Sequence, residues 1–478
     1  MKIRAGYLGL VLLGVILLFL IALSVLALPL YPGSHIVFVL FCIVFLMLWM
    51  MAWFGYRSYL YTIFSSLCLL GFWMKACAHL ITGREFVEPT GAFDGSGVAW
   101  DRSIIVSLVA GSAIFCFRVS HMLLMRKHKG VFVVEPAPSF APYWYASFRK
   151  HIWLASLFGV AIVAFLNFEL GINQAGLLPK NHLPFKLNAI IIWCLYSAFA
   201  FWMAALVWWD TCLGLAFRFE ALVFEGVLSS ITVLSRSLYV THVFHYSLSI
   251  LFNRDWIKPT FRKYMYMMIL FIAGMGIVLV AVAELRRALF YGETNKAEVA
   301  SPSSEHPKGM ASPQIFLLLS ERWIGLEGVM STSSYPDVGI ELFKQGWLDM
   351  PSYERKPVYE SVANSIYISP DYPNATKYNF LSTPGLVAML HLSGSLTVVG
   401  LGMFMLLAVF SFGEYLIFRL LQNPFILSLY GMIIAMMLHQ FGGLYVNLIQ
   451  VFEIGSMMVF LWGIKSIPDN FRSEKSVA

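Results

Sequence analysis

Residues 1–30 have the sequence MKIRAGYLGLVLLGVILLFLIALSVLALPL, and the segment 7–29 within them is apolar throughout. A cleavable signal peptide has an apolar core of about 7–15 residues. Crossing the hydrocarbon core of a bilayer takes about 20 apolar residues. The stretch therefore predicts a membrane helix that is retained, rather than a signal peptide.

The rest of the chain repeats this pattern. It is 59% hydrophobic and only 12% charged, whereas soluble globular chains average about 25% charged residues. This composition excludes an ordinary soluble protein and predicts an all-α polytopic membrane protein. We expect about twelve spans, close to residues 7–29, 35–55, 58–80, 103–124, 152–171, 187–208, 213–233, 237–253, 264–284, 386–411, 424–441 and 447–464.

Two of these segments carry the weakest signal. The segment 213–233 contains Arg218, Glu220 and Glu225, and the segment 237–253 is short. The pair forms either two full crossings or a re-entrant hairpin.

The distribution of positive charge predicts the orientation. Lys and Arg cluster in short connections such as RKHKG (126–130), FRK (148–150) and NRDWIKPTFRK (253–263). Short cytoplasmic loops are enriched in Lys and Arg, so we expect both termini in the cytoplasm. The net charge of +7 is thereby assigned to topology, and the bilayer rather than a nucleic acid is the expected partner.

The expected spans divide the chain into a membrane domain (1–284), a long external loop (285–385), C-terminal membrane helices (386–464) and a cytoplasmic tail (465–478). Within the loop, residues 293–313 are rich in Ser, Pro, Glu and Lys, a composition typical of flexible segments. Aromatic residues return from residue 314 onward. We expect this later part to fold against the membrane domain.

Polar residues gather on the predicted external side, first in GREFVEPTGAFDGSGVAWDR (83–102). A functional interpretation makes Asp94 or Asp101 a base, and makes Arg102 and Arg84 contacts for an anion. The alternative is an interfacial loop whose acids and bases pair with one another.

Two further segments lie between the middle spans. Lys180 and His182 in GINQAGLLPKNHLPFKLN (171–188) suit contact with a lipid phosphate, although a plain connecting loop fits as well. Arg236 lies at an external turn. Glu225 lies at bilayer depth, where an ionisable residue normally faces the protein interior or a water-filled cavity.

The last two segments flank the end of the long loop. LLLSERWIGLEGVMSTSSYPD (317–337) places Arg322 and Glu327 on an apolar, helical pattern. A guanidinium held by an acid can bind a phosphate or diphosphate bidentately, and a local ion pair that docks the loop is the alternative. Lys377 and His391 lie just before and just within the tenth expected span.

These segments together predict a class of substrate. An external face with many charges next to membrane helices suits a molecule with a lipid tail and an anionic head, such as a polyprenyl-diphosphate sugar. Arginines would stabilise the leaving diphosphate, and a carboxylate or a histidine would act as general base. The sequence contains no phosphate-loop, nucleophile-elbow or zinc motif, so we expect no metal and no cofactor.

The chain resembles the Wzy-type polymerases of O-antigen and exopolysaccharide repeat units. The resemblance rests on the twelve-span topology with a large late external loop. It also rests on short segments such as FDGSGVAWDR (93–102), LSR (234–236) and ERWIGLEGVMSTSSYPD (321–337).

This resemblance implies a metal-independent membrane glycosyltransferase in the bacterial inner membrane. Such an enzyme transfers a glycan from undecaprenyl diphosphate onto another lipid-linked repeat unit. Its expected catalytic residues here are Arg322, Arg236, Asp94 and Glu327. Expected partners are a chain-length regulator and a flippase.

Several rivals stay open. An O-antigen-ligase-like enzyme would use the same donor with a different acceptor, and a membrane acyltransferase would modify the glycan. A transporter or flippase would instead place charged residues along a path through the bilayer, and Lys75, Arg118, Glu225, His439 and Glu453 lie within or beside expected spans. A docking module without chemistry is the last alternative.

Overall fold

The computed structural model describes residues 2–54, 57–86, 88–126, 141–215, 218–253, 260–291, 323–350, 357–364 and 383–466. The secondary structure of these residues is built from helices, which confirms the predicted all-α class. The helices of the N-terminal group are α1 (Lys2–Ala27), α2 (His35–Trp53), α3 (Tyr59–Cys68), α4 (Lys75–Thr82) and α5 (Gly97–Arg126).

The middle of the chain forms a second group of helices. Its members are α6 (Tyr143–Leu170), α7 (Leu187–Trp193), α8 (Phe199–Cys212), α9 (Phe219–Val233), α10 (Arg236–Phe252) and α11 (Phe261–Tyr291). The C-terminal part contains α13 (Leu326–Ser334), α14 (Ile340–Trp347), α15 (Val358–Ala363), α16 (Leu386–His391), α17 (Leu396–Leu421), α18 (Pro424–His439) and α19 (Leu444–Lys465).

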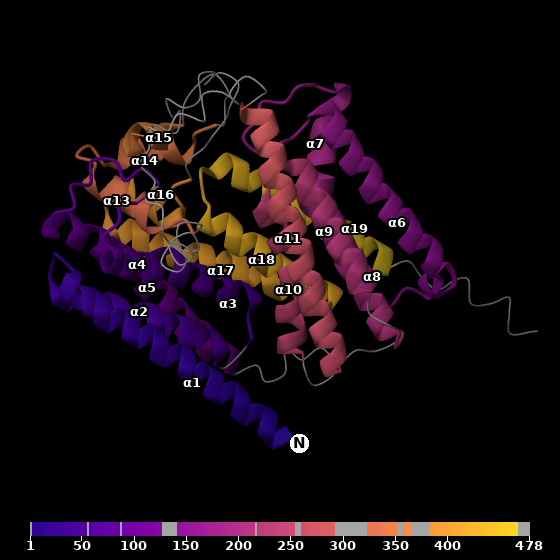
Figure 1. The fold of residues 1–478 in the computed structure, drawn as a ribbon, viewed down its shortest axis with the longest axis horizontal. Helices are drawn as coiled ribbons and strands as arrows, with labels where there is room; N and C mark the ends of the chain where they lie inside the picture. Colours follow the sequence, from indigo (N-terminus) through magenta and orange to yellow (C-terminus); the bar gives the residue numbers. More distant parts are fainter. Residues whose placement is uncertain are drawn as a thin grey trace, which may run out of the picture.

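Helix α18 joins the two groups into one bundle. It packs against α3 of the first group and against α8 and α10 of the second. Nearly all of its side chains are buried. In Figure 1 the helices α1–α5 lie on the left and α6–α11 on the right, with the yellow C-terminal helices between them.

The helices are those of a multi-pass membrane protein. Among the described residues, nine helices are long and apolar enough to cross a bilayer. The other three expected spans correspond to shorter helices, α9, α10 and α18, with 15, 17 and 16 residues. At about 1.5 Å per residue they reach about 22–26 Å, less than the roughly 30 Å of a typical hydrocarbon core.

The tenth expected span needs a correction. The sequence predicted one helix over 386–411, but the chain forms the short α16, then a break, and then α17 over Leu396–Leu421. The break contains Gly394 with a left-handed φ of 71°. Ser395 then begins α17 by accepting a hydrogen bond from the backbone N–H of Val398. The mean hydropathy of this region is high, so the local signals at Gly394 and Ser395 were missed.

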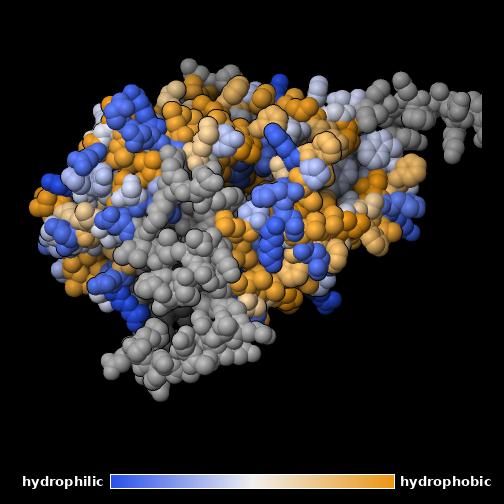
Figure 2. Space-filling model, turned by 90° about the horizontal axis from the view of Figure 1, so that it is seen from above, coloured by the Kyte–Doolittle hydropathy of each residue, from blue (hydrophilic) through white to orange (hydrophobic). Residues whose placement is uncertain are grey.

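Helices α13, α14 and α15 form a cap at one end of the bundle. Helix α13 packs against α5 and α16, and its residues from Leu326 to Thr332 are buried. The N-terminal end of α1 lies at the opposite end of the molecule from the cap (Figure 1). Seen from the cap side, the surface carries hydrophilic patches among apolar side chains (Figure 2).

Candidate functional site

A buried ion pair joins the cap to the helical bundle. The ammonium of Lys75 on α4 donates to a carboxylate oxygen of Glu327 on α13, and the two side chains are 0% and 4% exposed. Removing two charges from water is costly, and a buried pair that loses one partner becomes strongly unfavourable. Each of the two buried charges is therefore stabilised by the presence of the other.

Lys75 owes its place to an irregular stretch of helix. Residues Tyr59–Thr82 form one continuous helical stretch that is α-helical at both ends. Between the two ends, Leu69–Met74 forms a π-helical segment directly before Lys75. We call it the first π segment. A π segment inserts an extra residue and turns the side chains that follow to another direction, and such insertions occur frequently at functional sites.

Two glycines let the backbone of the cap approach this segment. A Cβ on Gly71, in the first π segment, would collide with the carbonyl oxygen of Ile324. A Cβ on Gly325, where φ is 153°, would lie 2.9 Å from the carbonyl oxygen of Gly71. Because neither residue has a side chain, α13 can begin against the π segment and carry Glu327 inward to Lys75.

A histidine completes the arrangement. The same Cβ on Gly71 would lie 2.8 Å from Cε1 of His439, at the end of α18. His439 is 4% exposed, interacts electrostatically with Lys75, and its Nε2 has no hydrogen-bond partner among the described residues. We call Lys75, Glu327 and His439 the cap site.

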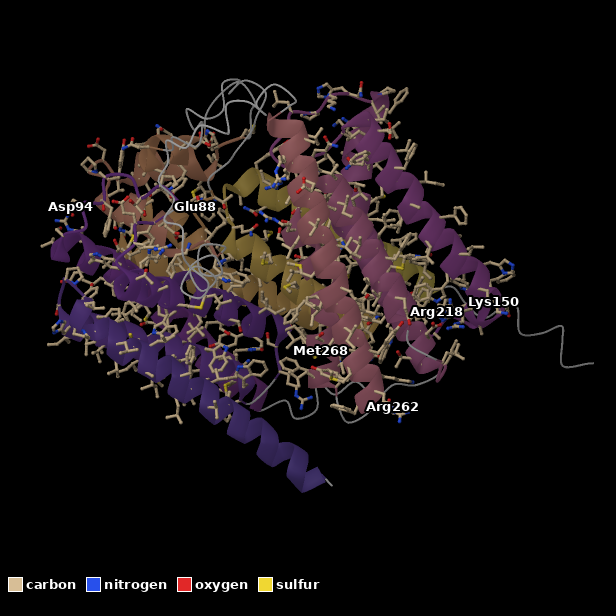
Figure 3. The ribbon with its side chains drawn as sticks, viewed as in Figure 1. Glu88, Asp94, Lys150, Arg218, Arg262 and Met268 are labelled. Carbon is tan, nitrogen blue, oxygen red and sulfur yellow. The ribbon has the colours of Figure 1, made fainter. Side chains whose placement is uncertain are left out.

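The connection between α4 and α5 forms one wall beside the cap site. The hydroxyl of Ser331 on α13 donates to the carbonyl of Pro89 over 3.1 Å. Burial raises the pKa of Tyr359 on α15, and the carboxylates of Glu327 and Glu88 add to that rise. Glu88 lies inward from Asp94 along this connection (Figure 3). The first and fourth polar segments of the sequence are therefore brought together.

The cap site combines a cation, a carboxylate and an imidazole in a dry environment. Such a set can bind an anionic oxygen, accept a proton from a hydroxyl group and strengthen both interactions by excluding water. In the parts of the chain that the structure describes, no group of three or more His, Cys, Asp or Glu residues is arranged to hold a metal ion.

Of the four residues expected to be catalytic, Glu327 lies in the cap site. Arg322, one residue before the described part of the cap, falls outside the described residues, as does Lys377. Both stay predictions. His391 is 8% exposed on α16, the helix that packs against α13, and its Nδ1 has no hydrogen-bond partner among the described residues.

The two aspartates of the first polar segment hold local structure. Asp94 is exposed and accepts a hydrogen bond from the backbone N–H of Ser96, which lowers its pKa. A carboxylate with a low pKa is a weak general base. Asp101 accepts hydrogen bonds from the Tyr31 hydroxyl at 2.9 Å and the Ser34 backbone N–H at 2.9 Å, and so ties the α1–α2 connection to α5.

The other basic residues expected to bind substrate, and Arg236, which was expected to be catalytic, are spread over the molecule. Arg84 is exposed in the α4–α5 connection and Arg102 is exposed near the start of α5. The carbonyl oxygen of Arg84 lies 2.9 Å from Nδ1 of His79. Lys180 and His182 are exposed in the α6–α7 connection, and Arg236 begins α10. Figure 1 shows the α4–α5 connection at the left and the α6–α7 connection at the upper right.

A second buried pair lies in the other half of the bundle. Nδ1 of His242 on α10 is 2.9 Å from Oε1 of Glu225 on α9, and both side chains are buried. This pair also adjoins a π-helical segment, Cys194–Ala198, through the carbonyl of Tyr196. Both buried pairs, Lys75–Glu327 and Glu225–His242, therefore lie next to a π-helical segment.

Sequence reasoning did not assign Lys75 or His439 to the cap site. Lys75 and His439 were noted only as ionisable residues within or beside expected spans, where they favoured the transporter alternative. The glycine in LLGFWMK (69–75) and those in WIGLEG (323–328) are the signal that indicates a close backbone approach. One sequence without contacts cannot show that these two glycine positions meet.

Comparisons with protein-family models, with curated proteins and with solved structures find no match.

Proposed function

We propose that this membrane protein is a glycosyltransferase that polymerises lipid-linked saccharides, with Lys75 and Glu327 as its central residues. The observation that carries the proposal is the buried ion pair between the cap and the bundle. It offers a cation for a diphosphate and a carboxylate for a hydroxyl group, at the junction between membrane helices and the long polar loop. A donor with a polyprenyl tail and a diphosphate head would meet both environments at this junction.

The proposed reaction exchanges one ion pair for another. The diphosphate of the donor replaces Glu327 as the partner of Lys75, and this exchange frees the Glu327 carboxylate. The bond between the sugar C1 and the diphosphate oxygen breaks, and the acceptor hydroxyl oxygen bonds to C1. The hydroxyl proton passes to Glu327 and then to water, and polyprenyl diphosphate leaves with its negative charge balanced by Lys75.

The predicted arginines keep supporting roles in this proposal. Arg84 lies in the α4–α5 connection, which forms the wall beside the cap site. In the same region the ring of His79 stacks on Phe86, with 3.8 Å between centroids. Arg84 would bind the diphosphate from that side, and Arg322, which lies outside the described residues, stays a predicted second contact for it. Arg236, Lys180 and His182 lie in the other half of the molecule and are assigned to the acceptor lipid. The enzyme would act at the outer face of a bacterial inner membrane.

The test is polymer formation by the reconstituted full chain from a polyprenyl-diphosphate-linked repeat unit. Glu327→Gln keeps the shape but removes the base, so polymer formation should fall about 10²–10⁴-fold. Glu341→Gln is the matched control, because Glu341 is exposed on α14 and pairs only locally with Lys344. Glu327→Gln with unchanged activity would contradict the proposal.

A charge exchange separates chemistry from simple docking. The double variant Lys75→Glu with Glu327→Lys restores an ion pair between the same positions. If the pair only docks the cap, this variant should form polymer at the wild-type rate. The proposed reaction requires that it stay inactive, although its cap is docked.

The same assay distinguishes the ligase-like alternative. A polymerase extends a second lipid-linked repeat unit, whereas a ligase transfers the glycan only when lipid A-core is supplied. Product formed solely with lipid A-core would favour the ligase reaction over polymerisation.

A second candidate function is transport of a lipid-linked saccharide. The observation that favours it is the burial of ionisable groups far from the cap, such as Glu225 and His242. A transporter should move a fluorescent lipid-linked saccharide across vesicles without lengthening it. Movement that survives in Glu327→Gln, together with an absence of polymer in the wild type, would favour transport over polymerisation.

A further inference from the structure

Helix α10 carries a row of polar residues along one buried face. His242, His245, Ser249 and Asn253 follow one another at intervals of three or four residues, which places them on one side of the helix. The first three are buried. Polar side chains inside a membrane domain are costly, and they commonly mark proton or substrate pathways. We call these four residues the α10 stripe.

The end of the α10 stripe at His242 contains ionisable groups. Nδ1 of His242 lies 2.9 Å and 3.2 Å from the two oxygens of Glu225, and Nε2 lies 3.1 Å from the carbonyl oxygen of Tyr196. Ser229 donates a further hydrogen bond of 2.9 Å to Oε1 of Glu225. The carboxylate is therefore held from both sides.

These contacts require a proton between the two residues. A backbone carbonyl only accepts, so Nε2 of His242 must carry a hydrogen. Nδ1 faces a carboxylate, and one proton must lie between the nitrogen and the oxygen for a hydrogen bond to exist. That proton belongs to an imidazolium beside a carboxylate or to a carboxylic acid beside a neutral ring. Either form gives a pair that holds one exchangeable proton.

His245 offers the next acceptor on the same face. Its Nδ1 lies 2.9 Å from the hydroxyl of Ser428 on α18, and its side chain is 0% exposed. Its Nε2 has no hydrogen-bond partner among the described residues. A buried ring nitrogen of this kind is rare, because buried polar atoms are nearly always paired. It lies one helical turn from His242, with which it interacts electrostatically.

Both ends of the α10 stripe continue into polar contacts. Towards the α6–α7 connection, His242 contacts the backbone carbonyl of Tyr196. The hydroxyl of the same residue interacts separately with the side chain of Asn173, which is partly exposed. At the other end, Asn253 donates a hydrogen bond of 2.8 Å to the Tyr59 hydroxyl on α3. Of these two ends, the contact between Tyr196 and Asn173 is nearer to the ionisable pair.

We propose that Glu225, His242 and His245 form a proton-binding site inside the bundle, separate from the cap site and reached from the α6–α7 connection. In this proposed site the proton rests on Nδ1 of His242, which is then an imidazolium beside the Glu225 carboxylate. It passes to His245 when the Nδ1–H bond of His242 breaks and an N–H bond forms on the second ring. Only a proton moves in this step, and no group is oxidised or reduced.

The groups that face this site come from several helices. Tyr196 lies in the π-helical segment between α7 and α8, Tyr246 lies on α10, and both interact electrostatically with nearby carboxylates. For Tyr196 that carboxylate is Glu453 on α19, and for Tyr246 it is Glu225. From α18 the facing group is the uncharged hydroxyl of Ser428. Glu225 is therefore the carboxylate in direct contact with His242.

The experiment is nitrogen NMR of the full chain in lipid bilayers, with ¹⁵N-labelled histidine, between pH 5 and pH 10. His242→Asn assigns the signal. His242 should carry two N–H groups at low pH and one at high pH. Glu225→Gln should move that midpoint towards acid by about 1–3 pH units, because it removes the opposite charge. Glu453→Gln is the matched control and should leave the midpoint in place.

Two further measurements use other variants, so that the proposal can be tested even if Glu225→Gln misfolds. In His242→Asn, the infrared band of a protonated carboxylic acid should appear at pH 7, because Glu225 has lost its cation. In His245→Asn, exchange of the His242 ring proton with D₂O should slow at least several-fold. The proposal is overturned by an unchanged His242 between pH 5 and pH 10, by an unmoved midpoint in a folded Glu225→Gln, by the absence of the carboxylic-acid band, or by an unchanged exchange rate.

Discussion

The carbonyl group of Ile324 lies against Gly71, at the position that any side chain on Gly71 would occupy. This relationship places the backbone of the cap directly against the backbone of the first π segment. It also sets the depth at which α13 enters the bundle, and therefore the contact between Glu327 and Lys75. A methyl group at residue 71 should act on the cap site although it carries no charge.

Gly71→Ala should destabilise the protein by about 1–3 kcal/mol, which is the usual cost of extra volume in a packed interior. The loss should be concentrated in the cap, so limited proteolysis should cut within 323–350 faster than elsewhere. Gly276→Ala on α11 is the control, because a Cβ there meets nothing within 4 Å. Equal proteolysis rates for the two variants would show that the close approach does not hold the cap.

A second prediction concerns the corner between α2 and α3. Glu414 on α17 accepts hydrogen bonds from the backbone N–H of Tyr59 at 2.7 Å and from the hydroxyl of Ser58 at 2.6 Å. Its carboxyl oxygens thus lie at the N-terminal end of α3, where backbone N–H groups need acceptors. Arg118 lies at the opposite kind of terminus and donates to the carbonyl of Phe54 after α2, at 3.1 Å.

Glu414→Ala should therefore cost about 1–3 kcal/mol, because it leaves buried donors of the first turn of α3 without their acceptor. The measurement is the unfolding midpoint in detergent. Glu284→Ala is the control, since Glu284 forms an exposed pair with Arg287 on the same helix, and exposed pairs contribute little. A larger loss in the control would contradict this account of Glu414.

A third prediction concerns the link between α6 and α8. Arg149 donates from Nε and Nη2 to the two oxygens of Asp210, at 2.6 Å and 2.7 Å. The hydroxyl of Tyr145 donates to the same carboxylate at 2.7 Å. A lysine cannot form the two parallel hydrogen bonds.

Arg149→Lys should lower stability by about 1.5–3 kcal/mol, the range for hydrogen bonds to charged groups. Lys150→Arg is the control, because the neighbouring Lys150 is exposed and lies at the end of the bundle away from the cap (Figure 3). Thermal unfolding of both variants decides the matter. Arg149→Lys with the stability of the wild type would show that the paired geometry contributes nothing.

The sequence was sufficient for the fold class because a membrane imposes one strong rule. Each crossing must satisfy its backbone hydrogen bonds within itself, so a run of apolar residues such as 7–29 predicts a helix without any knowledge of its neighbours. The break before α17 was missed because Gly394 and Ser395 act locally, whereas the apolar average extends over about 20 residues.

The cap site could be predicted only in part, because it depends on contacts between distant segments. Lys75 and Glu327 are separated by 252 positions, and each was visible alone as a charge among apolar residues. Their meeting depends on the first π segment and on two glycines whose purpose is clear only when the backbones touch. Asp101 illustrates a second limit on what one sequence shows, because its hydrogen bonds from Tyr31 and Ser34 depend on a contact between α5 and the α1–α2 connection.

The last prediction follows from the burial of Lys75, whose side chain is 0% exposed. If the proposed reaction takes place at Lys75, the cap must move away from α5, to which α13 is joined by a 2.8 Å contact between the hydroxyls of Ser103 and Ser333. A disulfide between Ser103→Cys and Ser333→Cys should hold the cap in place. Oxidation of this variant should reduce polymer formation at least tenfold, and reduction should restore it.

The two single-cysteine variants are the controls, because oxidation should leave their activity unchanged. Mass spectrometry of peptides establishes that the bond forms between the introduced cysteines rather than with one of the six native cysteines. Full activity of the oxidised double variant would mean that the substrate reaches its site without cap movement. Because Lys75 is enclosed by the cap, that result would also remove Lys75 and Glu327 from direct contact with the diphosphate.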